Sequence, residues 1–582
     1  MKKNFVINNK EFSFLFEENV RIGMEEVNDC NGVTLYRISF DWEELCSPKQ
    51  ITLSYSIPCV ETYIIWDPLQ KLRTIPFGDK QITDSRLASG MPLKGALSKD
   101  GRNTCLIALS DVKTPISERI KVGKTYEGFL DIFIDFFTML TGPFKHYETF
   151  LRIDSRRIRF EDAVYEARDW FESLGYKNSH VPEASKYPMY STWYSYKQDI
   201  TDEDVIKECE RAAALGMKAV IIDDGWQTDD TSTIYGYCGD WKPISHKFHD
   251  MKALTDKIHS LGMKVMLWFS VPFIGKYSEN YASFEGMYLC YFENTECSAL
   301  DPRYKRVREF LTSIYAKAVR EWGLDGLKLD FIDRFKANGE LSDGMDFVSV
   351  EDAVQQLLKD VYTELTDIDP EILIEFRQPY YGPVVNTYGN MMRVWDCPLD
   401  GATNRNQTIN LRLVSGSCAV HADMMYWHRE DTPESVALQL WGTVFSVPQI
   451  SVRLNEITDE HEKVLRNYLT FWTEHRNTLT KGKLRVGYSE NGYGYAETAY
   501  GEERIAMLSS TSLFEVRSDV SKSYLINLTD TDGIVLKNPD GAELACTGYD
   551  CRGNVTDSFI SCDRLSEIRV PLGGLVKIGL LK

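Results

Sequence analysis

The fold is decided by the stretch Gly323-Leu324-Asp325-Gly326-Leu327-Lys328-Leu329-Asp330-Phe331. Its apolar residues alternate as in a buried parallel strand, and Lys328 and Asp330 lie toward the C-terminal end of that strand. A core strand has no packing use for ionisable groups, because an unpaired buried charge is costly. We therefore interpret Lys328 and Asp330 as chemical rather than structural, although ion-pair networks also place charges in such positions.

Around this strand, from about Pro188 to Thr480, short apolar segments alternate with amphipathic ones such as Asp202–Leu215 and Arg306–Trp322, a pattern typical of βα units. The expected strands are Met189–Tyr194, Ala219–Asp223, Lys264–Phe269, Gly326–Phe331, Ile372–Phe376, Met391–Trp395, Ala419–Met424 and Val447–Val452. Eight strands in roughly 290 residues indicate a (β/α)8 barrel. The alternative is a doubly wound sheet, but no glycine-rich GxGxxG follows any of these strands.

Two β-rich regions flank the barrel, so the fold class is α/β with additional β-domains. Residues 1–180 contain alternating segments such as Val33–Phe40 and then a helical stretch, Arg159–Ser173, and we expect a β-sandwich there. Residues 181–482 form the barrel. Residues 483–582 return to short strands with turns such as Asp532-Gly533, which predicts an antiparallel β-domain.

Charge and cysteine usage limit the partners. The net charge of −20 argues against nucleic acid or an anionic membrane as partner. No run reaches the roughly 18 apolar residues of a membrane span, and the start of the chain has no signal-peptide core. The 13 cysteines form no CxxC pairs, which favours reduced thiols in a cytoplasm. We expect a cytoplasmic protein, with a homo-oligomer possible.

Carboxylates and indoles dominate the residues at the expected strand ends, where a (β/α)8 enzyme builds its site. In strand order they are Trp193; Asp223, Asp224 and Trp226; Trp268; Lys328 and Asp330; Arg377; Arg393, Asp396 and Asp400; His421 and Asp423. Carboxylates bind vicinal hydroxyls, aromatic faces stack on sugar rings, and two carboxylates across a cleft are what acid-assisted glycosidic cleavage requires. The pattern predicts a carbohydrate site.

Other interpretations exist for single residues. Trp193 and Trp268 can be core residues, the pair Asp223-Asp224 can cap a helix, and His421 alone is a weak signal. Asp and His at strand ends also describe barrel metallohydrolases. Those usually carry an HxH at the first strand, which here is aromatic, so we expect neither a metal nor another cofactor.

Five short motifs resemble those of the α-galactosidase (melibiase) family, glycoside hydrolase family 36. They are Thr192-Trp193-Tyr194, Ile222-Asp223-Asp224-Gly225-Trp226, Leu267-Trp268-Phe269-Ser270-Val271-Pro272, Ala299-Leu300-Asp301-Pro302 and Leu327-Lys328-Leu329-Asp330-Phe331. The resemblance covers nearly the whole chain, since these enzymes also have an N-terminal β-supersandwich and a C-terminal β-domain. It implies a retaining, exo-acting α-glycosidase that works by double displacement.

The same resemblance implies roles for individual residues. Asp330 is similar to the nucleophile, and the acid/base lies after the sixth strand. Asp223 and Asp224 resemble the pair that binds sugar hydroxyls, and Lys328 and Arg393 the basic residues that hold hydroxyls and orient the carboxylates. Trp193, Trp226 and Trp268 resemble pocket walls.

The chemistry of the residues agrees. A nucleophilic carboxylate must stay ionised, and Lys328 would lower the pKa of Asp330. An acid must start protonated, and Trp395 and Pro398 would give Asp396 an apolar surrounding. Retention predicts carboxylates about 5–5.5 Å apart.

Two strand ends depart from the family pattern. In the family the acid/base aspartate follows an arginine after three intervening residues, but counting from Arg393 reaches Cys397, a poor general acid. Asp396 lies one residue early and Asp400 three late; a bulge or altered loop can bring either into place, and we expect Asp396 first. On the fifth strand, Arg377 replaces small residues; it can clamp a carboxylate or sulfonate or pair with Glu375 or Asp423.

The leading hypothesis is therefore a glycoside hydrolase, most simply an α-galactosidase acting on short oligosaccharides. A related α-glycosidase or transglycosidase acting on an α-glucoside, an α-N-acetylgalactosaminide or an acidic sugar is the alternative. A non-catalytic sugar-binding protein on the same scaffold is a hypothesis from another class, motivated by the displaced acid/base.

Overall fold

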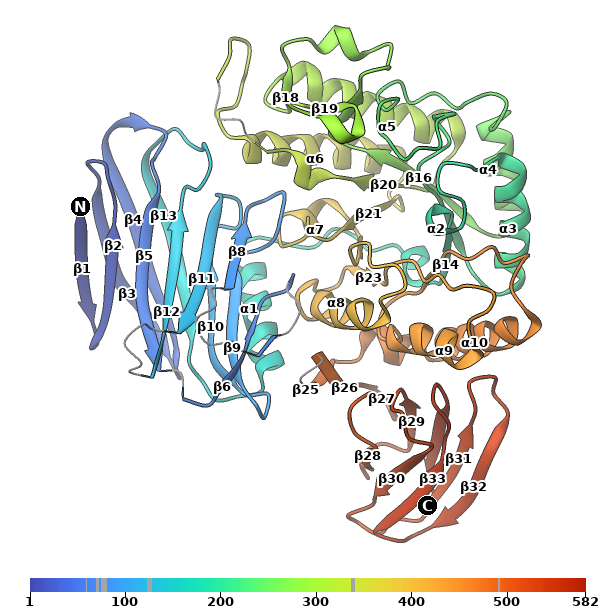
Figure 1. Cartoon of the computed structure of the whole chain (residues 1–582). Coiled ribbons are helices and arrows are strands. Elements are labelled where there is room, and N and C mark those ends of the chain that lie inside the picture. Colours follow the sequence, from blue (N-terminus) through green and yellow to red (C-terminus); the bar gives the residue numbers. More distant parts are fainter. Residues whose placement is uncertain are drawn as a thin grey trace.

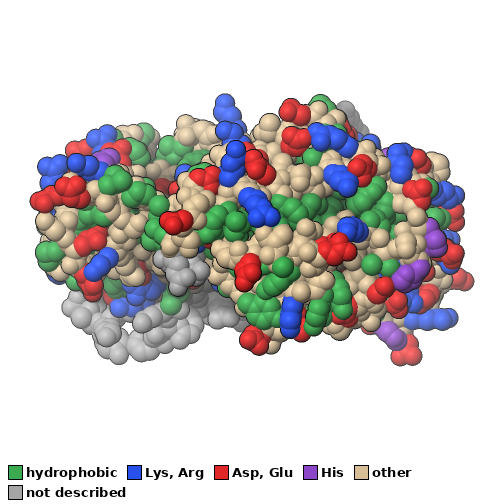
Figure 2. Space-filling view, turned by 90° about the horizontal axis from the view of Figure 1, so that it is seen from above, with side chains coloured by type: hydrophobic (Ala, Val, Ile, Leu, Met, Phe, Trp, Pro, Cys, Tyr) green, Lys and Arg blue, Asp and Glu red, His purple; other side chains and the backbone are tan. Residues whose placement is uncertain are grey.

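A computed structural model of the chain describes residues 1–58, 60–69, 73–74, 81–122, 128–336, 341–489 and 492–581. A β-sandwich, a larger α/β part and a smaller β-domain follow one another along the chain (Figure 1). Within the described residues, none of the helices has the length and apolar character needed to cross a bilayer. On the face displayed in Figure 2, basic and acidic side chains are interspersed.

The N-terminal sandwich consists of two antiparallel sheets. The strands of the first, in spatial order, are β1 (Lys2–Ile7), β2 (Lys10–Leu15), β5 (Ile51–Pro58), β12 (Phe129–Phe136), β11 (Ile116–Val122) and β8 (Gln81–Ser85). Those of the second are β3 (Arg21–Cys30), β4 (Val33–Cys46), β13 (Phe144–Asp154), β10 (Asn103–Leu109), β9 (Leu93–Ser98), β6 (Thr62–Trp66) and β7 (Arg73–Thr74). Alternating residues such as Phe14 and Phe40 fill the space between the sheets.

The outer face of the second sheet is also apolar. Trp66 and Leu97 belong to the same buried cluster as Phe160 of helix α1 (Phe160–Ser173) and the outward-facing residues of the barrel strands. The sandwich therefore packs on the barrel through a continuous core.

The central part is a parallel barrel in which strand order follows chain order. Its strands are β14 (Met189–Ser191), β15 (Ala219–Ile222), β16 (Lys264–Ser270), β20 (Gly326–Asp330), β21 (Leu373–Arg377), β22 (Met391–Arg393), β23 (Ala419–His421) and β24 (Gln449–Ile450). β24 pairs with β14, and a parallel bridge between His421 and Val447 joins the last two strands. The predicted (β/α)8 barrel is confirmed.

Helices of unequal length connect the strands. They are α2 (Trp193–Tyr196), α3 (Asp202–Ala214), α4 (Met251–Ser260), α5 (Lys305–Trp322), α6 (Val350–Ile368), α7 (Val385–Tyr388), α8 (Gly401–Val414), α9 (Pro433–Gly442) and, after the last strand, α10 (Asp459–Lys481). A small sheet of β17 (Phe273–Gly275), β18 (Tyr288–Phe292) and β19 (Cys297–Leu300) extends the loop after β16. The expected first strand was too long, because its last residues, Trp193 and Tyr194, start α2 instead.

The barrel interior is layered. Its floor is a separate apolar cluster that includes Met189, Met266, Met391 and Leu373. Two residues further along the strands, on the same face, lies a charged and polar layer of Lys328, Glu375, Arg393, His421 and Gln449, all at most 3% exposed. The polar groups at the strand ends lie next to this layer, further along the strands.

The C-terminal part is an antiparallel-rich β-domain. Its larger sheet contains, in spatial order, β25 (Arg485–Ser489), β26 (Gly492–Tyr500), β27 (Glu503–Leu508), β29 (Lys522–Asn527), β34 (Leu575–Leu580), β31 (Leu544–Tyr549) and β32 (Val555–Ser561). The smaller contains β28 (Leu513–Glu515), β30 (Gly533–Lys537) and β33 (Leu565–Arg569). Within the larger sheet β27 and β29 run parallel, the one departure from the expected antiparallel pairing there.

Candidate active site

Asp330 ends strand β20 and its two oxygens have different surroundings. Oδ1 accepts hydrogen bonds from Arg377 Nε (2.8 Å), the Tyr380 hydroxyl (2.6 Å) and the Phe331 backbone N–H (2.7 Å). Phe331 has a left-handed backbone, with φ at +66°, which an aromatic residue rarely adopts. Among the described residues, Oδ2 accepts only from Trp268 Nε1 (3.2 Å), with Lys328 Nζ 3.8 Å away. Oδ2 is therefore the oxygen left for further chemistry.

The charge state of Asp330 is set by its cations. Burial alone would raise the pKa of this carboxyl, but Arg377 and Lys328 outweigh burial and hold the pKa well below its usual range. Asp330 is thus an ionised carboxylate at neutral pH, as a nucleophile requires.

Arg393 organises the opposite side. Its guanidinium is fully buried and donates to Asp396 Oδ1 (2.9 Å) and Asp423 Oδ1 (2.5 Å), with Glu375 at 3.5 Å from Nε. Asp423 Oδ2 accepts from the Tyr194 hydroxyl (3.0 Å) and the Cys397 N–H (2.7 Å), so this buried carboxylate is fully engaged. The Asp396 side chain is 44% exposed and is the reachable carboxylate of the two.

The surroundings of Asp396 differ from the expected apolar ones. Burial would raise the pKa of Asp396, but Arg393, Arg377 and Lys328 lower it. Burial does raise the pKa of Asp423, to about 6, against the opposing effect of Arg393. These cations come from strands β20, β21 and β22, so the sequence next to Asp396 could not predict their effect on its pKa.

Asp400, the second acid/base candidate, has a structural role. It is the N-cap of α8, and its carboxylate accepts from the Thr403 N–H (2.9 Å) and the Thr403 hydroxyl (2.5 Å). These bonds satisfy an otherwise unpaired N–H at the helix start. Of the two candidates, Asp396 is the one that contacts Arg393.

The two adjacent aspartates after β15 point to different neighbours. Asp223 Oδ2 accepts from Lys328 Nζ (2.7 Å), which brings it into the Asp330 cluster. Asp224 lies away from this cluster, with its oxygens held by the side-chain amides of Gln227 (2.6 Å) and Gln198 (2.8 Å). Burial raises the pKa of Asp224 to about 7.

The three tryptophans that we expected to form pocket walls lie in different surroundings. Trp268 donates to the nucleophile candidate, and Trp193 is half-buried. Trp226 is fully buried, donates to the Trp268 carbonyl (3.0 Å) and packs against Trp241 and Phe269. Trp226 is thus a core residue behind the site, which corrects its assignment as a pocket wall.

His421 lies in the charged layer rather than at the opening of the barrel. It is fully buried and donates through Nε2 to the Ser185 carbonyl (2.8 Å). Burial lowers its pKa to about 3, so His421 is neutral and supports the layer from below.

Sequence reasoning missed two aromatic residues of the site. Tyr380 donates to Asp330, and half-buried Tyr235 stacks on Trp268 with ring centroids 6.1 Å apart. Both lie in loops beyond a strand end, where periodicity gives no signal. The Arg377-Gln378-Pro379-Tyr380 stretch was the available clue to the first.

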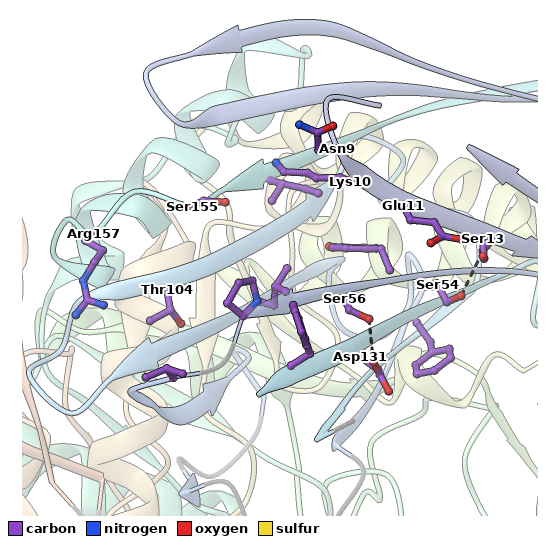
Figure 3. A pocket seen from close by; sticks show the side chains of 17 residues that line it. Asn9, Lys10, Glu11, Ser13, Ser54, Ser56, Thr104, Asp131, Ser155 and Arg157 are labelled. Atoms are coloured by element: carbon purple, nitrogen blue, oxygen red, sulfur yellow. Dashed lines mark hydrogen bonds between the residues drawn. The ribbon is translucent and has the colours of Figure 1, made fainter. Parts of the chain in front are cut away.

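A large cavity lies away from this cluster. A space of about 940 Å³ opens in the N-terminal sandwich where β2 and β5 diverge, and its rim includes Lys10, Ser56, Asp131 and Arg157 (Figure 3). None of the strand-end residues lines it. Cavity size therefore does not identify the chemistry here, whereas the charged cluster around Asp330 does.

Comparison with known proteins gives consistent similarities. Residues 178–375 match the Melibiase family model. The chain is 27% identical over 157 residues to alpha-galactosidase 2 of Pediococcus pentosaceus, covering 26% of this chain and 22% of that protein. It is 29% identical over 124 residues to the A type blood alpha-D-galactosamine galactosaminidase of Flavonifractor plautii, covering 18% and 11%. In these alignments the chain spans less than a quarter of the curated relatives.

Solved structures extend the likeness to the whole fold. The alpha-galactosidase AgaA of Geobacillus stearothermophilus, in complex with 1-deoxygalactonojirimycin, matches with a TM-score of 0.66 at 13% identity over 98% of this chain and 83% of that one. The alpha-galactosidase TtGalA of Thermus thermophilus matches with a TM-score of 0.55 at 16% identity over 83% of this chain and 96% of that one. At such identities the likeness is one of fold.

Proposed function

We propose that this chain, whose residues 178–375 form a melibiase-family segment, is a retaining, exo-acting α-glycosidase that cleaves α-galactosides through a glycosyl-Asp330 intermediate. The environment of Asp330 supports the proposal: within the described part of the chain, three donors bond one oxygen of this ionised carboxylate and Trp268 alone bonds the other. A retaining glycosidase needs such a nucleophile opposite a second carboxylate.

In the first step, Asp330 Oδ2 attacks the anomeric carbon while the bond to the leaving oxygen breaks. Asp396 gives its proton to that oxygen, so the leaving group departs as a neutral alcohol. The three donors on Oδ1 keep the carboxylate oriented during attack. In the second step Asp396 takes a proton from water, the water oxygen bonds to the anomeric carbon, and Asp330 is released.

The pH profile follows from the cations around Asp396. Because Arg393, Arg377 and Lys328 lower its pKa, the protonated, active form of Asp396 becomes scarce as pH rises. We therefore expect kcat/KM to be highest in the acidic range and to fall toward neutral pH.

The sugar-binding groups are the residues that surround the nucleophile. Asp223, paired with Lys328, and the partly open Trp193 supply hydroxyl-binding and stacking groups. Arg393 is already committed to carboxylates, which supports a role in orienting Asp396. The oligosaccharide or glycoside is bound from the strand-end side. All cysteines in the described ranges are free thiols, which supports a reducing, cytoplasmic location.

Azide rescue tests the mechanism and both carboxylate roles together. With 4-nitrophenyl α-D-galactoside, Asp330→Gly should lose at least about a thousandfold in kcat and, with azide, yield β-galactosyl azide. Asp396→Ala should instead yield α-galactosyl azide, because azide then opens the glycosyl-enzyme from the other face.

Asp400→Asn is the matched control and should keep its activity without azide. An unchanged kcat for Asp330→Gly would refute the mechanism. Rescue of an Asp400 variant would transfer the acid/base role to that residue.

A panel of nitrophenyl α-glycosides tests the sugar specificity. If an α-glucoside or an α-N-acetylgalactosaminide is cleaved in preference to the galactoside, that sugar replaces galactose in the proposed function. Binding of galactose without cleavage of any panel member would indicate the non-catalytic alternative.

A further inference from the structure

Lys197 is an unusual cation beside the candidate active site. It follows the one-turn helix α2 at the end of the first barrel strand, and its backbone has φ +53° and ψ −136°. This region suits glycine and strains the backbone of a residue with a side chain. Such strain persists only where the surroundings impose it, and it points to a functional constraint.

The strain is imposed from both sides. Before Lys197, the Tyr194 hydroxyl is bonded to Asp423 at the end of β23. After it, the Gln198 amide is bonded to Asp224 at the end of β15. Gly225 brings the two segments together, since a Cβ there would lie 2.6 Å from the Gln198 Cα. The backbone at Lys197 is thus fixed between two strand ends.

The side chain of Lys197 is fixed as well. Its ammonium lies 4.7 Å from the ring centroids of both Trp193 and Tyr194. Burial lowers its pKa, and the carboxylates of Asp396, Asp223 and Asp423 oppose that shift, so these three are its electrostatic neighbours. The charge of Lys197 is therefore within electrostatic reach of both Asp223 and the acid/base candidate Asp396.

The other cations of the site already have partners. Lys328 is paired with Asp223 (2.7 Å), Arg377 with Asp330 (2.8 Å) and Arg393 with Asp396 (2.9 Å). Among the residues that the structure describes, the Lys197 ammonium makes cation–π contacts but no ion pair and no side-chain hydrogen bond. Its three N–H donors are available to a bound molecule.

We propose that Lys197 is a substrate-binding residue that selects glycosides whose transferred sugar bears an anionic group, such as the carboxylate of a hexuronic acid. This inference rests on the proposed function and narrows its substrate class. An anion beside Lys197 gains a charge-assisted hydrogen bond that a neutral hydroxymethyl group does not provide. Arg377 adds positive charge from β21 without leaving its bond to Asp330.

The test compares 4-nitrophenyl α-D-galactoside with its C6-oxidised counterpart, 4-nitrophenyl α-D-galacturonide. The unaltered enzyme should favour the acid in kcat/KM, and Lys197→Met should reduce that preference about 10- to 100-fold. In Lys197→Met, kcat/KM for the neutral galactoside should change by less than roughly threefold. Lys197→Arg should restore the preference for the acid. Lys99→Met, which removes an exposed lysine 5.9 Å from the Tyr63 ring, is the matched control.

Equal losses on both substrates in Lys197→Met, or no preference for the acid in the unaltered enzyme, would overturn the inference while leaving the proposed function intact. If neither substrate is cleaved, the proposed function fails, and calorimetric binding of methyl α-galacturonide against methyl α-galactoside still tests Lys197. Competition by galacturonate and by galactose 6-phosphate distinguishes a carboxylate from a phosphate as the preferred anion.

Discussion

At the scale of single residues, Arg377 sets the charge state of Asp330, the proposed nucleophile. Among the charged groups that lower the pKa of Asp330, Arg377 has the largest effect, and its Nε lies 2.8 Å from Asp330 Oδ1. Arg377→Gln should therefore raise the pKa of Asp330 and move the acidic limb of the kcat/KM profile to higher pH. Arg334→Gln, which changes an arginine near Asp333 in the next loop, is the control. Coincident acidic limbs for Arg377→Gln and the unaltered enzyme would contradict this role.

The sequence predicted a chemical role for Asp330, which stays a prediction, but not its bond to Arg377. A charged residue ending an apolar strand was enough to single out Asp330, and its lysine two residues earlier was found 3.8 Å away. The expected structural pairing of Arg377 with Glu375 or Asp423 is wrong, because its Nε bonds to Asp330, and binding of a substrate anion by Arg377 stays a prediction. Distances between neighbouring strand ends depend on barrel geometry, which one strand does not encode.

Glu118 is a second residue with a distinct prediction. It is fully buried in the sandwich, and its two oxygens have no hydrogen-bond partner within the described ranges. Burial raises its pKa from 4.5 to about 8, with Lys94 opposing. The native state then binds more protons than the unfolded state between these values, so stability falls as pH rises through that window.

Glu118→Gln removes this titration because the amide stays neutral. Its free energy of unfolding should be close to that of the unaltered protein at pH 5 and higher by about 4 kcal/mol at pH 9. Denaturant unfolding at the two pH values measures the difference. Glu148→Gln, at a glutamate with a 39% exposed side chain in the same domain, should show no such pH dependence.

At the scale of elements, the N-cap of helix α8 leads to different predictions for the two acid/base candidates, Asp400 and Asp396. Asp400→Ala removes the N-cap of α8 and should cost about 1 kcal/mol of stability with kcat unchanged. Asp396→Ala should leave stability nearly unchanged and lower kcat, most for substrates with poor leaving groups. Thermal unfolding and kinetics on both variants decide, and a loss of kcat in Asp400→Ala alone would reverse the assignment.

Element boundaries show which part of the barrel was readable from sequence. Strands β16 and β20 were predicted within one residue at each end, because a continuous apolar run defines β16 and alternating apolar residues define β20. The expected Ala419–Met424 and Val447–Val452 shrink to Ala419–His421 and Gln449–Ile450, since the chain stays apolar after it leaves the sheet. Apolar composition indicates burial, and burial extends beyond the strand.

At the scale of the whole molecule, the sandwich supports the loop that follows Asp330, the proposed nucleophile. Arg86, in the turn after β8, bonds to Glu351 (2.6 Å) of α6 and to the carbonyls of Phe335 and Asp333. Both side chains of this ion pair are at most 5% exposed. Arg86→Met should therefore cost about 3 kcal/mol and reduce kcat, because the loop beyond Asp330 loses its support.

The sign of the pH dependence adds a check. Burial raises the pKa of Glu351 even with Arg86 present. In Arg86→Met the Glu351 carboxyl has lost its partner and can therefore take up a proton at low pH. The loss of stability should be smaller at pH 5 than at pH 8. Lys113→Met breaks the exposed pair with Asp352 and should cost below about 1 kcal/mol at either pH. Equal costs for the two variants would show that the buried pair is not a brace.

The methionines of the barrel floor have a use of their own. Met189, Met266 and Met391 are fully buried, and Met391 lies two residues before Arg393 of the charged layer on its strand. Flexible thioethers follow small movements of their neighbours at little cost. Their ε-methyl groups therefore form an internal set of spectroscopic probes: carbon-13 methyl resonances should register a change of charge or occupancy above them, at a depth that water does not reach.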